Sequence, residues 1–288
     1  METPPRLAVI GGSGFYSMPG LEDLQEHDLA TPFGKPSAPI AVGRLEGRMV
    51  AFLARHGIGH HISPSEINYR ANIYALKALG VERVVSISAC GSLREDYAPG
   101  EIVIPDQLFD FTRTRQRTFF GDGLVAHLSA ADPYCADLSK QLYQAVKETG
   151  AVVHMGGSFI TIEGPRFSTR AESNVFRAWG MALIGMTASP EAFLAREAEL
   201  CYVTMAHVTD YDVWHVSEAA VNVEMVVETL NRNTQIAQQA VRILARTLRA
   251  ERDCSCGTAL AGALITRPDR IPPETKARFD LLIGKYLR

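Results

Sequence analysis

Short apolar runs alternate along the chain with longer stretches in which apolar residues recur at helical spacing. The short runs are rich in β-branched residues and end at Gly, Arg or Pro, which is typical of strands. A run that is apolar at nearly every position indicates a strand covered on both faces. The expected strands are Leu7–Ile10, Met49–Ala54, Arg83–Ala89, Glu101–Ile104, Ser158–Glu163 and Cys201–Val208.

The longer stretches predict helices between these strands. Ser63 or Ser65 caps the first expected helix, and Gly80 ends it. The expected helices are Ser65–Leu79, Pro133–Thr149, Ser168–Trp179, Pro190–Glu199 and about 223–249. Strands that alternate with helices predict an α/β domain. Since no repeat or linker is visible, we expect one domain over residues 1–288, with about 251–288 as a C-terminal extension.

Composition narrows the possible partners. The 288 residues are 47% hydrophobic, and the formal net charge is −3. This balance gives no reason to expect a nucleic acid or an anionic membrane as partner. No apolar run reaches membrane-spanning length, and the first residues lead directly into an expected strand. We therefore expect a cytoplasmic protein with no membrane contact.

The five cysteines indicate that the chain is not a secreted disulfide scaffold. Most lie in apolar surroundings, but Cys254-Ser255-Cys256 lies in a polar stretch. This pair could form a local disulfide, be half of a metal site, or consist of two ordinary thiols. Metal binding is the weakest of the three readings, because no His or second Cys pair is near in sequence.

Thr209-Asp210-Tyr211-Asp212 places two carboxylates at the end of an expected buried strand. Ligands of α/β proteins bind at such ends. Side chains at i and i+2 of an extended backbone point the same way. The pair would suit a ligand edge with N–H groups, such as the N7/N6 edge of a 6-aminopurine. The alternative is a helix or turn cap, since Asp favours such positions.

Other polar clusters also follow expected strands. Gly11-Gly12-Ser13-Gly14 and Arg55-His56-Gly57 offer N–H groups, a hydroxyl and a cation to an anion. The first cluster lacks the helix that a dinucleotide fingerprint needs, so a dinucleotide is disfavoured. Arg55 could instead be a surface ion-pair partner, and His56 an ordinary polar residue.

Three further segments contain side chains that could contact a ligand. Cys90, within Ser88-Ala89-Cys90-Gly91-Ser92, is an unfavourable nucleophile because no base or cation is adjacent. In the segment Thr161–Glu172, Glu163 and Arg166 could simply pair with each other, and Phe167 could be core or a stacking surface. In Met186-Thr187, the default role of the methionine is core packing.

Taken in order, these six motifs resemble the purine nucleoside phosphorylase family, and most closely its 5'-methylthioadenosine phosphorylase branch. The resemblance covers nearly the whole chain to about residue 249. It implies a single α/β domain with a mixed central sheet and a distorted barrel flanked by helices. It also implies a homotrimer or homohexamer that acts in purine salvage on a purine nucleoside and inorganic phosphate, without cofactor or metal.

The resemblance also assigns roles to individual residues. The implied phosphate-binding residues are Ser13, Arg55, His56, Ser88, Ala89 and Thr187. The implied nucleoside-binding residues are Cys90, Gly91, Phe167, Ser168, Met186, Asp210 and Asp212, with Asp210 and Asp212 also catalytic. Val223, Val226 and Val227 match an apolar pocket for the 5' group, and His127 matches a residue that reaches a neighbouring subunit's site. Heat-adapted members of the broader family have a similar C-x-C motif near the C-terminus. For Cys254-Ser255-Cys256 this resemblance implies a reversible disulfide or a covalent link between subunits.

The implied reaction is phosphorolysis of 5'-methylthioadenosine to adenine and 5-methylthioribose 1-phosphate. Phosphate would face the positive charge that develops on the sugar, while Asp210 protonates N7 of the leaving base. The main alternative is a broad or 6-oxopurine phosphorylase, for which two carboxylates facing O6 would be a mismatch. A hydrolytic nucleosidase and a non-catalytic purine-binding protein are the remaining alternatives.

Overall fold

The computed structural model describes residues 4–11, 18–215 and 223–287, and it describes side chains in the last range only from residue 233. The strands are β1 (Leu7–Gly11), β2 (Leu21–His27), β3 (Ile40–Leu45), β4 (Arg48–Ala54), β5 (Arg83–Ser92), β6 (Ile102–Ile104), β7 (Gln107–Phe111), β8 (Val153–Met155), β9 (Ser158–Ile162), β10 (Leu183–Gly185) and β11 (Cys201–Asp210). The helices are α1 (Tyr69–Ala78), α2 (Ala136–Glu148), α3 (Arg170–Ala178), α4 (Ala188–Glu197), α5 (Val223–Thr247) and α6 (Pro273–Ile283). Short 3-10 turns cover Cys256–Thr258, Pro268–Arg270 and Gly284–Tyr286.

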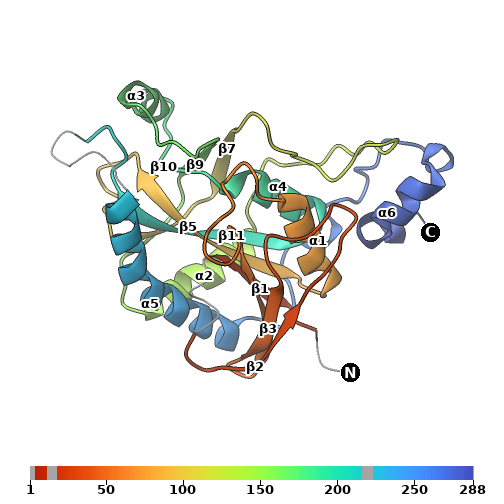
Figure 1. The fold of residues 1–288 in the computed structure, drawn as a ribbon, viewed down its shortest axis with the longest axis horizontal. Coiled ribbons are helices and arrows are strands. Elements are labelled where there is room, and N and C mark those ends of the chain that lie inside the picture. Colours follow the sequence, from red (N-terminus) through yellow and green to blue (C-terminus); the bar gives the residue numbers. More distant parts are fainter. Residues whose placement is uncertain (1–3, 12–17, 216–222, 288) are drawn as a thin grey trace.

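The strands form one mixed sheet that branches at β5 (Figure 1). One path runs in the order β2-β3-β4-β1-β5-β10-β9-β7, and β11, β6 and β8 extend the sheet from the other side of β5. β1 is parallel to β4 and β5, and β11 is parallel to β5, whereas β10 is antiparallel to β5. The expected α/β fold with a mixed central sheet is therefore confirmed.

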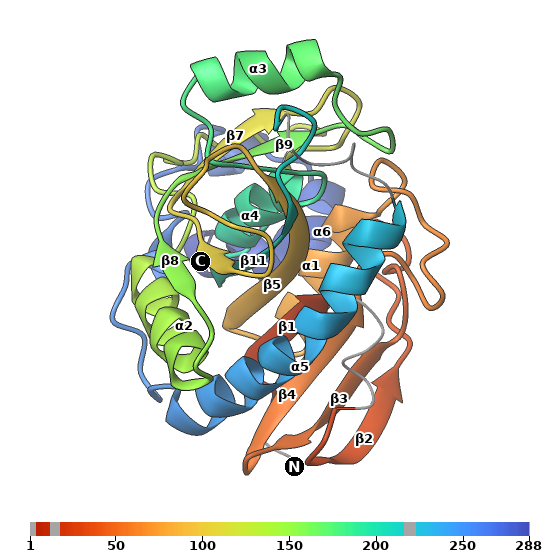
Figure 2. The same ribbon diagram turned by 90° about the vertical axis from the view of Figure 1, so that its left-hand side faces the viewer.

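Helices cover both faces of this sheet, as Figure 2 shows for α2 and α5 on one side and α1, α4 and α6 on the other. The sequence of β1 shows why a strand can be covered by helices on both faces. Its residues Leu7 and Val9 pack in the core beneath α2 and α5, while Ala8 and Ile10 pack in the core beneath α1 and α4. Because alternate side chains of a strand point to opposite faces, a continuous apolar run satisfies both layers.

Helix starts differ from the expected ones by a few residues. The first helix begins at Tyr69, because Asn68 rather than Ser63 or Ser65 is the N-cap and its side chain accepts a hydrogen bond from Ala71 N at 3.1 Å. Ser63 instead bonds to Glu66. At α3 the expectation that Ser168 or Thr169 is the cap is confirmed for Thr169, which forms a capping box with Glu172.

The C-terminal segment packs on the body of the protein. Leu260, Phe279 and Leu282 are buried in the same core cluster as residues of β1 and α1. The expected terminal helix after the two prolines is present as α6. The division of the chain at about residue 251 stays a prediction. Among the described residues, no helix is both long and apolar enough to cross a membrane.

Candidate active site

The carboxyl ends of four parallel strands meet at one edge of the sheet. Gly11 at the end of β1 is paired with Ala54 at the end of β4, and Gly91 on β5 is paired with Asp210 on β11. The backbone N–H of Arg55 donates to Gly11 O at 3.1 Å, which joins the first two ends. Motifs that are far apart in sequence therefore lie together where α/β proteins bind ligands.

Asp210 and Asp212 lie at this edge, and both carboxylates are buried. Asp210 accepts hydrogen bonds from the Thr209 hydroxyl at 2.6 Å and from Asp212 N at 2.7 Å. Burial has the largest effect on the pKa of Asp210 and raises it to about 6, although the two hydrogen bonds act to lower it. Asp210 therefore does cap the turn, as the alternative reading expected, and it also binds its proton more tightly than an exposed carboxyl group.

Asp212 supplies the open acceptor of the pair. Its Oδ2 is buried and has no hydrogen-bond partner among the described residues. Its φ of 52° lies in the left-handed region, which residues other than glycine rarely occupy. Burial also raises the pKa of Asp212, against the opposing effects of the nearby Ser173 hydroxyl and of Val213 N–H. A buried acceptor held in an unusual backbone conformation is the kind of feature that a bound ligand explains.

Gly91 makes room for both carboxylates. A Cβ at this position would lie 2.9 Å from Asp210 Oδ1, 3.0 Å from Ile184 Cγ2 and 3.2 Å from Asp212 Cβ. Any side chain on Gly91 would displace at least one of these groups. The neighbouring Cys90 is buried, and burial together with the Asp210 charge raises the pKa of its thiol. This agrees with the expectation that Cys90 is not a nucleophile.

Two expected phosphate ligands converge from different strands. The Ser88 and Thr187 hydroxyls are both buried, and their oxygens lie 3.4 Å apart. Thr187 precedes α4, whose backbone departs from helical geometry at Ser189, and its hydroxyl makes no capping hydrogen bond. The two hydroxyls contact each other and can each donate to the oxygen of an anion. Ala89 lies next to Ser88 on β5, whereas Ser13 lies outside the described residues.

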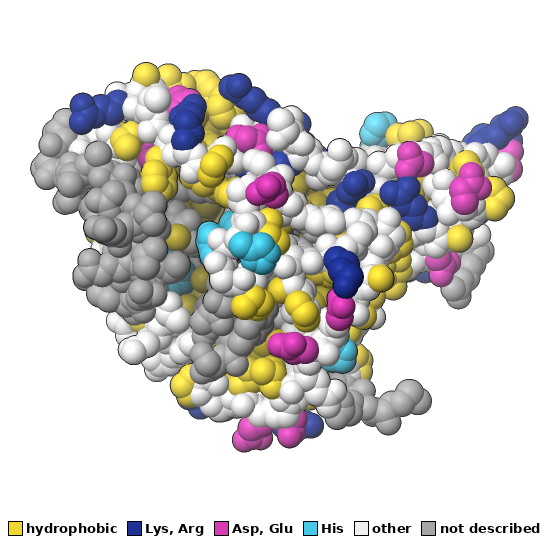
Figure 3. Space-filling view, in the orientation of Figure 1, with side chains coloured by type: hydrophobic (Ala, Val, Ile, Leu, Met, Phe, Trp, Pro, Cys, Tyr) yellow, Lys and Arg dark blue, Asp and Glu magenta, His cyan; other side chains and the backbone are white. Residues whose placement is uncertain are grey.

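His56 lies at the start of the loop that follows β4. Figure 3 shows histidine side chains near the middle of the face in view. The rings of His56 and His60 stack, with their centroids 4.2 Å apart. His56 Nδ1 is 2.9 Å from Ile62 O, so this nitrogen carries the hydrogen and Nε2 is an acceptor in the neutral ring. Burial, reinforced by the charge of Arg55, lowers the pKa of His56 to about 4. The ring therefore stays neutral near pH 7, and its Nε2 can accept a hydrogen bond from the P–OH group of hydrogen phosphate.

Arg55 is far more enclosed than an exposed phosphate ligand would be. Its Nε and Nη2 donate to the two carboxylate oxygens of Glu191 at 2.8 and 2.9 Å. Nη1 donates to Ile87 O at 3.0 Å, and Nη2 also donates to Ser86 Oγ at 2.6 Å. Of its five N–H donors, these bonds leave one on Nη1. The alternative of a surface ion pair is wrong, because both partners of this ion pair are buried.

The expected base-binding residues lie on the loops around β9 and β10. Phe167 is 37% exposed and so has a free ring surface, while the buried Ser168 Oγ has no partner among the described residues. Ser168 lines a cavity of about 230 Å³ together with Phe111, Ile162, Gly164 and Phe176. Met186 lies close by, since its Sδ would be 2.6 Å from a Cβ on Gly164.

A buried arginine organises these loops. Arg115 donates to the carbonyls of Met186 at 2.6 Å, Ser189 at 2.8 Å and Glu163 at 2.7 Å. The expected pairing of Glu163 with Arg166 is wrong. Glu163 instead accepts from Arg115 Nε at 3.2 Å, and Arg166 pairs with Glu172 at 2.6 Å. Arg115 rather than Arg166 reaches Glu163, because the Arg115 side chain is buried beneath the loop that carries Glu163, whereas the Arg166 side chain faces solvent.

The remaining expected ligands are His127 and the three valines of the 5' pocket. His127 is exposed, and its backbone N–H donates to Ala263 O at 2.9 Å, on the C-terminal segment. Figure 1 shows the segment after β7 running out to α6, away from α3 and the end of β11. The side chains of Val223, Val226 and Val227 lie outside the described residues.

Residues 6–246 match the family described as the phosphorylase superfamily. The chain belongs to this superfamily. A relative from Koribacter versatilis named S-methyl-5'-thioadenosine phosphorylase is 52% identical over 280 residues, which are 97% of this chain and 96% of the relative. A methylthioadenosine phosphorylase from an antarctic soil metagenomic library is 45% identical, with a TM-score of 0.93 over 98% of this chain and 99% of its own. The Schistosoma mansoni methylthioadenosine phosphorylase in complex with adenine is 36% identical, with a TM-score of 0.85 over 90% of this chain and 98% of its own.

Sequence reasoning missed two residues of this phosphorylase-superfamily site. Glu191 follows Pro190 in a helix first turn, where an acidic residue usually serves only the helix dipole. Its apolar neighbours Ala192 and Leu194 were the available sign that this turn is buried. Arg115 had no comparable signal, because it is one of several arginines in a polar stretch.

Proposed function

We propose that this chain catalyses phosphorolysis of 5'-methylthioadenosine, giving adenine and 5-methylthioribose 1-phosphate. The named relatives and the superfamily match support this reaction class. Phosphate is the co-substrate, and no other cofactor is needed. The C1'–N9 bond breaks with its electron pair passing to the purine, and a phosphate oxygen bonds to C1'.

The observation that carries the proposal is the buried carboxyl group of Asp210 with its pKa raised to about 6. The purine leaves as an anion unless a proton reaches it, and in this proposal Asp210 gives that proton to N7. A carboxyl group that is protonated in an appreciable fraction near neutral pH is a suitable general acid. No enzyme nucleophile is required, which fits the inert thiol of Cys90.

The open acceptor of Asp212 supports a preference for 6-aminopurines. A buried unpaired oxygen gains a hydrogen bond from the N6 amino group of adenine. Facing the O6 carbonyl of hypoxanthine or guanine, the same oxygen would meet another acceptor and stay unpaired. Such a mismatch costs about 1–3 kcal/mol, or roughly ten- to a hundredfold in relative efficiency.

The phosphate side is supported by the hydroxyls of Ser88 and Thr187 and by the neutral ring of His56. The hydroxyls donate hydrogen bonds to the oxygens of a hydrogen phosphate dianion, and His56 Nε2 accepts a hydrogen bond from its one P–OH group. Arg55 contributes its remaining Nη1 hydrogen and fixes Ile87, which precedes Ser88. The apolar 5' pocket of Val223, Val226 and Val227 and the assembly into a trimer or hexamer, by which His127 would reach a neighbouring site, belong to the proposal as expectations from sequence.

Base release from four nucleosides tests this function. The assay compares 5'-methylthioadenosine, adenosine, inosine and guanosine, each with and without inorganic phosphate. We expect release only with phosphate, methylthioadenosine to exceed adenosine by about tenfold through burial of its methylthio group, and the two 6-oxopurines to be poorest. Release without phosphate would identify a hydrolase, and equal turnover of inosine would remove the role given to Asp212.

A further inference from the structure

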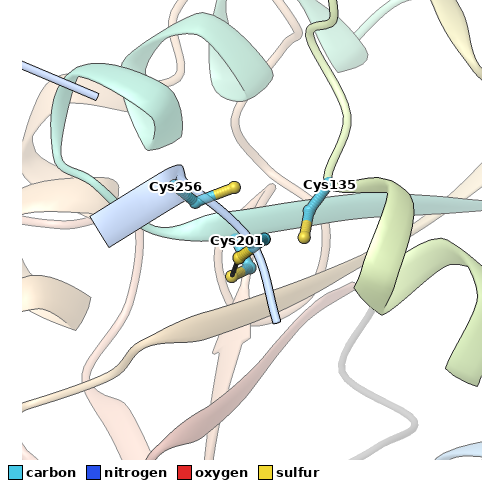
Figure 4. Close-up of side chains that lie close together, drawn as sticks. Cys135, Cys201 and Cys256 are labelled. Atoms are coloured by element: carbon cyan, nitrogen blue, oxygen red, sulfur yellow. Dashed lines mark hydrogen bonds between the residues drawn. The ribbon is translucent and has the colours of Figure 1, made fainter. Parts of the chain in front are cut away.

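Four cysteines from distant parts of the chain converge at the end of the sheet opposite the candidate active site. Cys135 precedes α2, Cys201 is the first residue of β11, and Cys254 and Cys256 lie on the C-terminal segment. Their Sγ atoms all lie within 4.8 Å of one another, and Cys201 and Cys254 are 3.4 Å apart. Figure 4 shows Cys135, Cys201 and Cys256 directed at one small volume.

The spacing of these sulfurs suits a tetrahedral metal site. Zn²⁺ binds thiolate sulfur at about 2.3 Å, which places the four sulfurs of a regular tetrahedron about 3.8 Å apart. The sulfurs of Cys201 and Cys254 are 3.4 Å apart, and all four sulfurs lie within 4.8 Å of one another. Bringing the sulfurs to the ideal spacing requires shifts of an ångström or less, which rotation of Cys side chains provides. A set of four thiolates is selective for Zn²⁺ over Mg²⁺ or Ca²⁺.

The surroundings favour deprotonated sulfur. Cys135 is the N-cap of α2, and its Sγ accepts a hydrogen bond from Leu138 N at 3.5 Å. A helix N-terminus stabilises a thiolate. Three of the four cysteines are buried and Cys254 is partly buried. All five cysteines of the chain are free thiols in the structure.

A path to the site is also present. A surface cavity of about 360 Å³ opens on Cys254, and the charged residues of its lining are Arg6, Glu82, Glu251 and Arg252. The two guanidinium groups and two carboxylates balance, so the cavity matters here as an entrance rather than as a source of charge. The cavity gives an ion or a small chelator access to the cluster, which a closed core would deny.

We propose that Cys135, Cys201, Cys254 and Cys256 bind one Zn²⁺ ion as a structural site that fastens the C-terminal segment to α2 and β11. Binding releases the thiol protons to solvent and changes no oxidation state. The sequence had made a metal the least favoured role for Cys254 and Cys256, because no other ligand was near them. The fold supplies the missing half of the site from Cys135 and Cys201.

The first test is the zinc content of the full-length protein, purified without chelators and reconstituted with Zn²⁺ under reducing conditions. We expect about one zinc per chain, together with free thiols after denaturation in a chelator. Replacement by Co²⁺ should give the absorption bands of tetrahedral cobalt bound to four thiolates. A content below about a tenth of an ion per chain would overturn the proposal, as would disulfide bonds in the reconstituted protein.

Serine variants assign the ligands. Cys201→Ser and Cys256→Ser should each lose the zinc, whereas Cys90→Ser, which changes the cysteine outside the cluster, should keep it. Ser255→Ala is a closer control, because Ser255 is exposed and lies between two proposed ligands. Retention of zinc by both cluster variants would refute the assignment. The cobalt spectrum of the wild type does not depend on any variant folding.

Stability and activity then separate this site from the catalytic one. Removing zinc should lower Tm of the wild type by roughly 5 °C or more and leave that of Cys256→Ser unchanged. Cys201 and Asp210 are at opposite ends of β11, which is about 30 Å long. Phosphorolysis at 25 °C should therefore change by less than about twofold on chelation. An unchanged Tm would show that the cluster has no structural role.

Discussion

The buried ion pair of Arg55 and Glu191 can be tested by replacing Glu191 with Gln. Glu191 is 0% exposed and Arg55 3%, so neither charge is solvated by water. Glu191 accepts two bonds from Arg55 and one from the Tyr202 hydroxyl at 2.7 Å. Burial acts to lower the pKa of Arg55, but the charge and hydrogen bonds of Glu191 outweigh it and raise that pKa. Neutralising Glu191 removes this support, but the intrinsic pKa of a guanidinium group lies so far above 7 that the arginine stays charged.

The expected loss follows from that uncompensated charge. Breaking a buried ion pair by removing one partner costs about 3–5 kcal/mol. Gln keeps the size and one acceptor oxygen of Glu, so we expect a loss near the lower limit, about 3 kcal/mol of unfolding free energy. The extra positive charge beside Ser88 should also attract phosphate. Inorganic phosphate should therefore stabilise Glu191→Gln more than it stabilises the wild type.

Urea unfolding at pH 7, with and without phosphate, measures both effects. Glu197→Gln is the matched control, because Glu197 is also buried but bonds only to neutral groups, the Thr118 hydroxyl and Phe119 N, each at 2.7 Å. Burial raises the pKa of Glu197 to about 7, so at pH 7 the amide replaces a group that is already about half protonated. Its loss should stay below about 1 kcal/mol. Equal losses in the two variants would refute the idea that the Arg55 charge sets the cost.

Three further predictions concern pH, packing and phosphate. Folding raises the pKa of Glu197 from 4.5 to about 7, so its contribution to stability is complete below pH 4.5 and is lost as pH rises to 7. The loss is about 3 kcal/mol in all. The unfolding free energy of Glu197→Gln should therefore depend less on pH across this window than that of the wild type. Gly91→Ala should lower kcat/KM at least about tenfold and stability by about 1–3 kcal/mol, because its Cβ meets Asp210 Oδ1 at 2.9 Å. An unchanged kcat/KM would mean that this carboxylate is free to move. Thr187→Ala should raise the KM for phosphate about tenfold or more and leave the nucleoside KM nearly unchanged, and equal effects on both would remove Thr187 from the phosphate site.

Most strands with both faces buried could be predicted from the sequence, because burial favours an unbroken apolar run; β3 was missed because Gly43 and Arg44 interrupt its run. β1, β4, β5 and β11 fall in this class, and their ends carry most of the expected site residues. β2 could not be predicted in this way, because it is a largely exposed edge strand with the polar sequence LEDLQEH. The three-residue strands β8 and β10 are too short for any periodicity to be visible.

Contacts between residues that are far apart in sequence were the part of the site that could not be predicted. The sequence placed Arg55 and Asp210 at strand ends, but it did not show that Arg55 meets Glu191, which is 136 residues away. Nor did it show that Cys254 meets Cys201, 53 residues away. Such contacts depend on how strands and helices are ordered in the sheet, and local patterns carry little information about that order.

The central claim is that the carboxyl group of Asp210 gives a proton to N7 of a 6-aminopurine. The most direct measurement is the ratio of kcat/KM for 5'-methylthioadenosine to kcat/KM for 5'-methylthioinosine, in wild type and Asp210→Asn at saturating phosphate. These substrates differ only at the 6 position of the base. The amide cannot protonate N7 but can donate to O6, so methylthioadenosine should lose about a hundredfold and methylthioinosine much less. The ratio should therefore fall at least about tenfold in the variant, and a ratio that stays the same would contradict the account.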